Sequence, residues 1–153
     1  MKIIFLDFNG VLDTYDNMDE INPDNLKRLK QIVDECDAKV VISSSIKNSY
    51  FHTGHFSELF QRIKKEIENV GIEVIGITPH ADTREEEIEL YLKGHPEVEN
   101  FCILDDDYEM LRLKDNLVKL PSQMQEGQMG LNDEYMNIAI EILGKSTKKL
   151  RKR

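Results

Sequence analysis

The sequence has few of the features that mark secreted or membrane proteins. It contains only two cysteines, Cys36 and Cys102, and no apolar stretch that approaches the roughly 20 residues needed to cross a bilayer. No small-residue cleavage site separates the apolar start from the charged segment 13–20. Both cysteines occupy apolar positions of periodic segments, which indicates buried, reduced thiols. We therefore expect a cytoplasmic protein with no disulfide and no membrane partner.

Positive charge is also scarce. The chain has 20 basic and 29 acidic residues, a net charge of −9, which disfavours indiscriminate binding to phosphate backbones. The exception is the segment 145–153, with six basic residues and no acidic one. We interpret this segment as a solvated basic tail, and the alternative is an arm that binds polyanions.

What the sequence does contain is an alternation of short apolar runs and helical patterns. This alternation predicts an α/β fold, a three-layer, doubly wound parallel sheet of about five strands. The absence of a linker predicts one domain over residues 1–144. Strands are expected at residues 2–8, 38–44, 72–78, 101–106 and 116–120.

Four helices are expected between and after these strands. Asn22 followed by proline predicts a helix over residues 22–36, and helical spacing predicts another over 56–70. A capping box at the start and glycine at the end predict a helix over 83–94. The last helix is expected to begin at Asn132.

Polar residues stand where the predicted strands end. Asp7 ends the first strand, Ser43 ends the second, and Asp105 with Asp106 ends the fourth, while Arg84 lies in the first turn of the third helix. Ligands of open parallel sheets bind at this carboxyl edge. Right-handed crossovers favour adjacent first and fourth strands, which would bring Asp7 near the acidic pair.

An acidic cluster of this kind predicts a divalent cation. Carboxylates that face one another without a cation repel and protonate, and a cluster with oxygen ligands only suits Mg²⁺. One oxygen of Asp7 could then bind the metal while the other attacks phosphorus, forming an aspartyl-phosphate that water hydrolyses. Ser43 and Arg84 would hold the phosphoryl oxygens.

Three segments resemble motifs of the haloacid dehalogenase (HAD) superfamily. DFNGVL at 7–12 resembles the first motif, D-x-D-G-[TV]-[LV], VVISSS at 40–45 is similar to the second, and ILDDD at 103–107 to the fourth. More narrowly, ISSSIK, REEEI, LDDD and GLND resemble the small HAD domains associated with bacterial RNA-repair proteins. The resemblance implies a HAD-like Rossmannoid fold and a hydrolase, specifically a phosphatase.

The resemblance also implies roles for individual residues. Asp7 would be the nucleophile and a metal ligand, and the main-chain carbonyl of Asn9 a second ligand. Asp105 and Asp106 would be the acidic pair that holds Mg²⁺, and Ser43 would bind phosphate.

The third motif is ordinarily a lysine. Arg84 is the candidate for this position, since a guanidinium can contact two phosphoryl oxygens at once. Lys47 and Lys64 are the substitutes, and the alternative for Arg84 is a set of surface ion pairs with its glutamate neighbours at 85–87.

Asn9 departs from the family pattern. HAD phosphatases normally carry Asp at this position, which protonates the leaving oxygen and then activates water. Asn does not titrate, and general acid–base catalysis contributes about 10²- to 10⁴-fold. The hypotheses are slow turnover, restriction to good leaving groups, a stalled phosphoenzyme, or substitution by Asp13.

The spacing of the motifs leaves no room for a conventional cap domain. Within the superfamily, an uncapped site goes with large substrates, such as a nucleic-acid end or a phosphoprotein. The leading prediction is therefore a phosphatase for an accessible phosphate monoester, possibly on RNA or DNA. The alternative is a weakened HAD fold that binds phosphate and metal without turnover.

Several other patterns have simpler explanations. The serines at 43–45 could cap a helix, and Asp107 could either cap a helix beginning at position 108 or touch the metal. His52 and His55 have a spacing that suits a metal but no evident third ligand. GKST at 144–147 lacks the first glycine of a P-loop. A receiver domain would need an Asp after the third strand, where this chain has Thr78.

Overall fold

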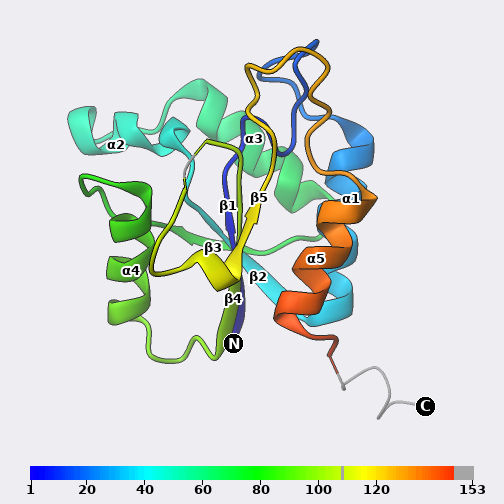
Figure 1. Cartoon of the computed structure of the whole chain (residues 1–153). Coiled ribbons are helices and arrows are strands. Elements are labelled where there is room, and N and C mark those ends of the chain that lie inside the picture. The colour runs from blue at the N-terminus through cyan, green and yellow to red at the C-terminus, as the bar shows by residue number, and fades with distance from the viewer. Residues whose placement is uncertain (108, 147–153) are drawn as a thin grey trace.

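Five parallel strands form one sheet in the order β3-β2-β1-β4-β5 (Figure 1). The structure, a computed structural model, describes residues 1–107 and 109–146. The strands are β1 (Lys2–Leu6), β2 (Ala38–Ile42), β3 (Val74–Ile77), β4 (Asn100–Asp105) and β5 (Leu117–Lys119). The α/β class, the five parallel strands and the position of β4 beside β1 are all confirmed. The described residues contain no cap domain.

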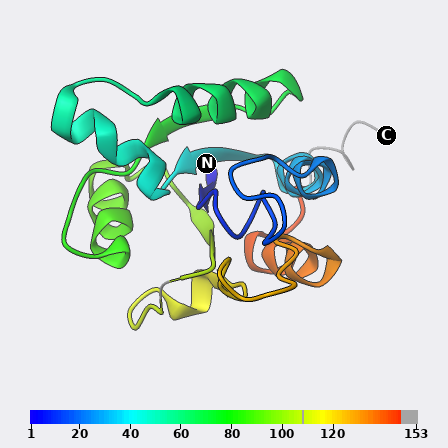
Figure 2. The same cartoon turned by 90° about the horizontal axis from the view of Figure 1, so that it is seen from above.

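Helices cover both faces of this sheet. Apolar residues of α1 (Pro23–Cys36), α3 (Glu58–Asn69) and α5 (Asp133–Leu143) pack with one face, and α4 (Arg84–Gly94) packs on the other. Figure 2 shows α1 and α5 on the side of the sheet opposite α4. The remaining elements are α2 (Asn48–Thr53) and the 3₁₀ turns η1 (Ser45–Lys47) and η2 (Lys114–Asn116). None of the described helices is both long and apolar enough to cross a membrane.

Side-chain caps fix where the long helices begin. Asn22, Thr83 and Asn132 each accept hydrogen bonds from backbone N–H groups in the first turn, as their positions predicted. Ser57 does the same for α3, so this helix begins at Glu58 and not at position 56. Each cap thereby satisfies backbone N–H groups that a helix N-terminus would otherwise leave unpaired.

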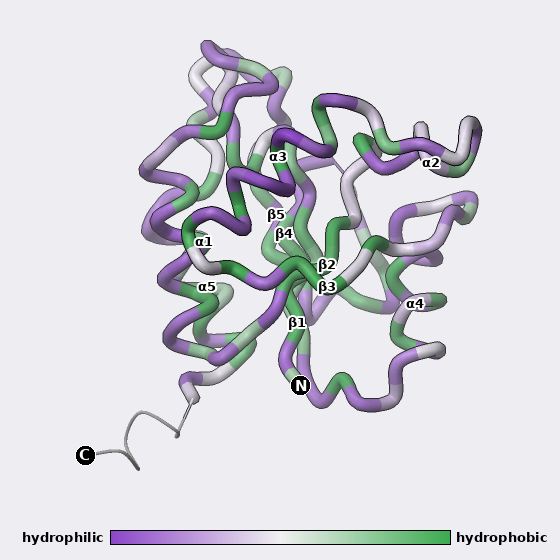
Figure 3. Tube along the Cα trace, turned by 180° about the vertical axis from the view of Figure 1, so that it is seen from behind, coloured by the Kyte–Doolittle hydropathy of each residue, from purple (hydrophilic) through white to green (hydrophobic). Residues whose placement is uncertain are grey.

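The core has two parts because alternate side chains of a strand point to opposite faces. Ile4 and Leu6 of β1 belong to the cluster under α1, α3 and α5, while Ile3 and Phe5 belong to the cluster under α4. Figure 3 shows apolar residues along most of the central strands. This parity directs Asp7, the residue that follows β1, toward the side of α4.

One local prediction needs correction, and one segment was left without a prediction. The segment 45–53, for which the sequence predicted no element, forms η1 and α2. Residues 109–113 form no helix, so Asp107 caps none there, and position 108 lies outside the described residues. Of the basic tail, residues 147–153 also lie outside the described residues. Cys36 and Cys102 are free and buried.

Candidate active site

The sheet register places Asp7 between the neighbouring strands. Leu6 is aligned with both Ile42 and Leu104, and the hydrogen-bond ladder continues one residue further. The backbone N–H of Asp7 donates to the Leu104 carbonyl at 3.0 Å, and that of Ser43 donates to the Leu6 carbonyl at 2.9 Å. These hydrogen bonds fix the backbone of Asp7 at the carboxyl edge of the sheet.

Asp7, Asp105 and Asp106 form a buried acidic cluster. One carboxylate oxygen from each lies within 4.8 Å of the others, although 98 positions separate Asp7 from Asp105. Burial raises the pKa of Asp7 well above its ordinary value, and the charge of Asp105 raises it further. Arg84 opposes this effect by lowering the pKa of Asp7. The cluster thus carries more negative charge than one guanidinium balances.

The donor set of this cluster fits a hard divalent cation. Oδ2 of Asp106 accepts a hydrogen bond from the backbone N–H of Gln123 at 2.6 Å, and Lys119 donates to the main-chain carbonyl of Asp106. Oδ1 of Asp106 is buried without a hydrogen-bond partner among the described residues. A buried carboxylate oxygen without a donor is costly, and a cation beside it would remove that cost.

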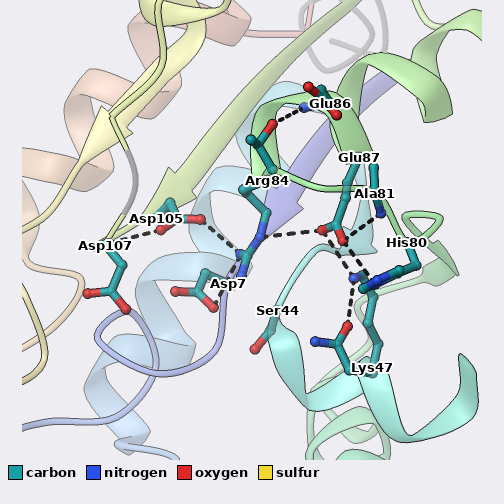
Figure 4. Close-up of polar contacts among 12 residues, drawn as sticks. Asp7, Ser44, Lys47, His80, Ala81, Arg84, Glu86, Glu87, Asp105 and Asp107 are labelled. Atoms are coloured by element: carbon teal, nitrogen blue, oxygen red, sulfur yellow. Dashed lines mark hydrogen bonds and ion pairs between the residues drawn. The ribbon is translucent and has the colours of Figure 1, made fainter. Parts of the chain in front are cut away.

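Arg84 reaches this cluster from the first turn of α4. Its Nη1 donates to Oδ2 of Asp105 at 2.9 Å and lies 3.6 Å from Oδ1 of Asp7 (Figure 4). Its Nε lies 3.6 Å from Oε1 of Glu87. Arg84 is 6% exposed, so the alternative of a surface ion pair does not describe it.

Two buried hydroxyls lie at the ends of β2 and β3. Oγ of Ser43 and Oγ1 of Thr78 have no hydrogen-bond partner among the described residues. Ser44 accepts from the backbone N–H of Ile46 and caps η1, so helix capping applies to Ser44 and not to Ser43.

The comparisons with known proteins agree with this arrangement. Residues 3–135 match the family model described as the HAD domain in Swiss Army Knife RNA repair proteins. The chain belongs to this family. A search of curated proteins and a search of solved structures each found no match. The buried acidic cluster of this HAD domain lies at the segments that resemble the first and fourth motifs.

Asn9, the departure from the HAD pattern, has its amide committed to the loop after β1. Its Nδ2 donates to Oδ2 of Asp13 and to Oδ1 of Asp19, both at 2.8 Å. Asp13 is fully buried and also accepts from Gly10 N, Asp19 N and Gln123 Nε2. Asp13 therefore accepts four hydrogen bonds that hold this loop together. Because its oxygens are occupied by these donors, Asp13 is a poor substitute for the missing acid.

A second buried ion pair lies behind Arg84 in this HAD domain. Nζ of Lys47 lies 3.2 Å from Oε1 of Glu87, and both side chains are almost fully buried. Burial lowers the pKa of Lys47, and Glu87 opposes this. Sequence reasoning named Lys47 but treated Glu87 only as a surface partner of Arg84, because a run of three glutamates in a first helical turn is typical of a solvated surface. Lys64, the other substitute, pairs with Glu68 on the surface of α3.

The remaining candidates lie outside the acidic cluster. Asp107 is exposed and donates its backbone N–H to Oδ1 of Asp105. His52 and His55 are exposed, and neither belongs to a metal-type group of described residues. Asp107 therefore supports the conformation of Asp105 through its main chain.

Proposed function

We propose that this HAD domain is a Mg²⁺-dependent phosphatase that hydrolyses phosphate monoesters through Asp7. The observation that carries the proposal is the buried cluster of three carboxylates with the Arg84 guanidinium at its side. The metal would be held by Asp7, Asp105, Asp106 and the main-chain carbonyl of Asn9. It would supply charge neutralisation of the cluster and of the phosphoryl oxygens.

Asp7 is the nucleophile in this proposal. Its carboxylate oxygen forms a bond to phosphorus, the ester P–O bond breaks, and the leaving oxygen takes a proton from water, since Asn9 has none to give. A water molecule then attacks the aspartyl-phosphate, which releases inorganic phosphate and restores Asp7. Arg84 and Ser43 hold the phosphoryl oxygens, and the unpartnered hydroxyl of Ser43 supports that role.

The substrate in this proposal is a phosphorylated nucleic-acid end. Two observations support it: the family is described by its occurrence in RNA repair proteins, and no cap covers the edge among the described residues. An open edge also admits a phosphoprotein, which is the alternative substrate.

A second candidate function is a phosphate- and metal-binding module without turnover. The observation that favours it is the position of Asn9, whose amide is held by Asp13 and Asp19 and carries no acidic proton. Without an acid, alkyl leaving groups depart slowly. This candidate requires the same acidic cluster but no chemistry.

Hydrolysis of 4-nitrophenyl phosphate separates these two functions. Its leaving group departs without protonation, so a phosphatase should turn it over with Mg²⁺ despite Asn9. The Asp7→Asn variant is the matched control, since it retains size and hydrogen bonding but not the nucleophile. Turnover by the natural chain alone supports the phosphatase, and equal rates for both chains favour the module.

A further inference from the structure

Two exposed aromatic side chains lie at the same edge as the acidic cluster. Among the Phe and Tyr side chains of the described residues, only Tyr50 and Phe51 are exposed, at 43% and 40%. They are neighbours on α2, which follows β2 at its carboxyl end (Figure 1). Exposed rings beside a polar site suit a ligand that has an aromatic face of its own.

A stack of rings fixes this pair to the core. Phe60 is buried, Phe56 lies parallel to it at 4.2 Å between centroids, and Tyr50 lies parallel to Phe56 at 4.6 Å. Phe51 meets Tyr50 edge to face at 5.6 Å. Because the stack holds α2 before any ligand arrives, little ordering is needed when a ring binds there.

Phe51 is linked to the acidic cluster through two buried side chains. Nζ of Lys47 lies 5.6 Å from the centroid of the Phe51 ring and 3.2 Å from Glu87. Glu87 in turn lies 3.6 Å from Nε of Arg84 (Figure 4). A cavity of about 180 Å³ lies between these elements, lined in part by Lys47, Asn48, His80 and Arg84. This cavity adjoins Arg84 and is lined mainly by polar groups, with Asp82 and Glu87 among them.

The segment that contains α2 lacks acidic residues, unlike the chain as a whole. Residues 38–57 contain no Asp or Glu, although the chain has 29 of them. Exposed His52 and His55 lie in this segment, and exposed His80 lies in the loop before α4, close to Asp82 in the sequence. His80 lies 5.9 Å from Phe51 between ring centroids. In a chain with net charge −9, α2 itself thus carries no acidic side chain that would repel a polyanion.

We propose that α2 is a stacking platform for the nucleobase next to the terminal phosphate, with Phe51 as its main ring. The inference rests on the proposed function and narrows its substrate to a single-stranded nucleic-acid end. Stacking of one base on an aromatic side chain strengthens binding by about 5- to 150-fold and tolerates every base. The platform would therefore select single-stranded ends without selecting their sequence.

The test compares two oligomers of equal charge. The full chain carrying Asp7→Asn, with Mg²⁺, is titrated with a phosphorylated hexaribonucleotide and with its abasic ribose-phosphate counterpart, followed by fluorescence anisotropy. Both 5′- and 3′-phosphorylated forms are used. We expect the base-containing oligomer to bind about 5- to 150-fold more tightly, and Phe51→Ala to bring this ratio close to one.

Two further variants keep the result interpretable. Phe51→Tyr retains a ring and should keep the ratio, and Ile138→Ala, at a position of similar exposure on α5, should also keep it. Equal affinities for the two oligomers, an unchanged ratio in Phe51→Ala, or tighter binding of a phosphotyrosine peptide would overturn the inference. Since this ratio requires no turnover, a chain that shows it but does not hydrolyse 4-nitrophenyl phosphate contradicts the phosphatase alone.

Discussion

Arg84 donates a hydrogen bond to Asp105 across 2.9 Å, from the first turn of α4 to the end of β4. Both side chains are buried, so the pair fixes the guanidinium at the edge of the acidic cluster. The contact of this guanidinium with Asp7, at 3.6 Å, is longer than a hydrogen bond. Arg84 is therefore already anchored where an incoming phosphoryl group would meet Asp7.

This anchoring predicts that Arg84 and Lys47 contribute unequally to hydrolysis. Arg84→Met should lower kcat/KM for 4-nitrophenyl phosphate by about 10²- to 10³-fold, the usual effect of removing one preorganised donor. Arg84→Lys should recover part of the loss, since the charge returns without the fork of donors. Steady-state kinetics with Mg²⁺ measure both variants.

The matched control is Lys47→Met, which removes the other buried cation of this region. Because Lys47 contacts Glu87 and not the acidic cluster, its loss should cost less activity than the loss of Arg84. A larger loss for Lys47→Met would transfer the third-motif role to Lys47.

The amide of Asn9 predicts a gain of function in Asn9→Asp. The amide of Asn9 donates to Asp13 and Asp19. A carboxylate at position 9 would be repelled by both, so it should turn away from them. Loss of the two hydrogen bonds should lower the free energy of unfolding by about 1–3 kcal/mol. Once free, the new acid can protonate a leaving oxygen, which should raise the rate for an alkyl phosphate by about 10²- to 10⁴-fold.

The rate for 4-nitrophenyl phosphate should rise much less, since its leaving group needs no proton. Asn9→Ala serves as the control, because it breaks the same hydrogen bonds without supplying an acid. Parallel rate measurements on the two substrates check the prediction, and an unchanged ratio between them would contradict it.

Gly10 predicts that the turn after β1 tolerates no side chain. Its φ is +82°, and a Cβ built there collides with the carboxylate of Asp106. Gly10→Ala should therefore displace Asp106 and abolish the rise in melting temperature that we expect Mg²⁺ to give the natural chain. Thermal unfolding with Mg²⁺ or with EDTA measures this.

Gly54→Ala separates the clash from the backbone cost. Gly54 has a similar φ of +77°, and a Cβ there meets nothing within 4 Å. The Gly54→Ala variant should have a free energy of unfolding that is lower by about 1–2 kcal/mol, the cost of alanine in the left-handed conformation. It should keep the expected response to Mg²⁺. Loss of that response in Gly54→Ala as well would show that the backbone cost alone explains both variants.

The acidic cluster was predictable because it follows from period and topology. The apolar runs that end in Asp7 and Asp105 show where these two strands end, and the crossover rule predicts that the strands are neighbours. Neighbouring parallel strands that end at the same edge bring the two carboxylates together. Capping residues located the starts of α1, α4 and α5 for the same local reason.

The network behind Arg84 was not predictable, because it depends on packing between distant elements. Lys47 and Glu87 are 40 positions apart, and each stands in a segment that is typical of a solvated surface. Only the approach of η1 to α4 buries them. The two hydrogen bonds that the Asn9 amide makes depend in the same way on the fold of the loop, since no periodicity places Asp19 beside it.

The contacts of Glu85 predict that the stability of the folded chain depends on pH. Its Oε2 accepts from the backbone N–H groups of Arg112 at 2.8 Å and Leu113 at 2.9 Å, which ties α4 to the loop after β4. Although desolvation alone would raise it, the pKa of Glu85 is lowered by these hydrogen bonds and by the charge of Arg112. The folded state therefore holds the ionised form more strongly than the unfolded state does.

The depressed pKa of Glu85 sets the direction in which stability changes with pH. Because the folded pKa is depressed, the stabilisation by Glu85 is complete above the ordinary pKa of a glutamate and is lost as pH falls through the folded value. Glu85→Gln, which keeps an acceptor but no charge, should lower the free energy of unfolding by about 1–2 kcal/mol at pH 7. The difference between the two chains should shrink from about pH 5 downward.

Urea unfolding of both chains between pH 7 and pH 3.5 measures this difference. Glu89→Gln is the control, since among the described residues Glu89 pairs only with the exposed side chain of Arg112. This substitution should lower the free energy of unfolding by at most about 1 kcal/mol. A Glu85→Gln difference that stays constant over this range would place the stabilisation in the shape of the side chain and not in its charge.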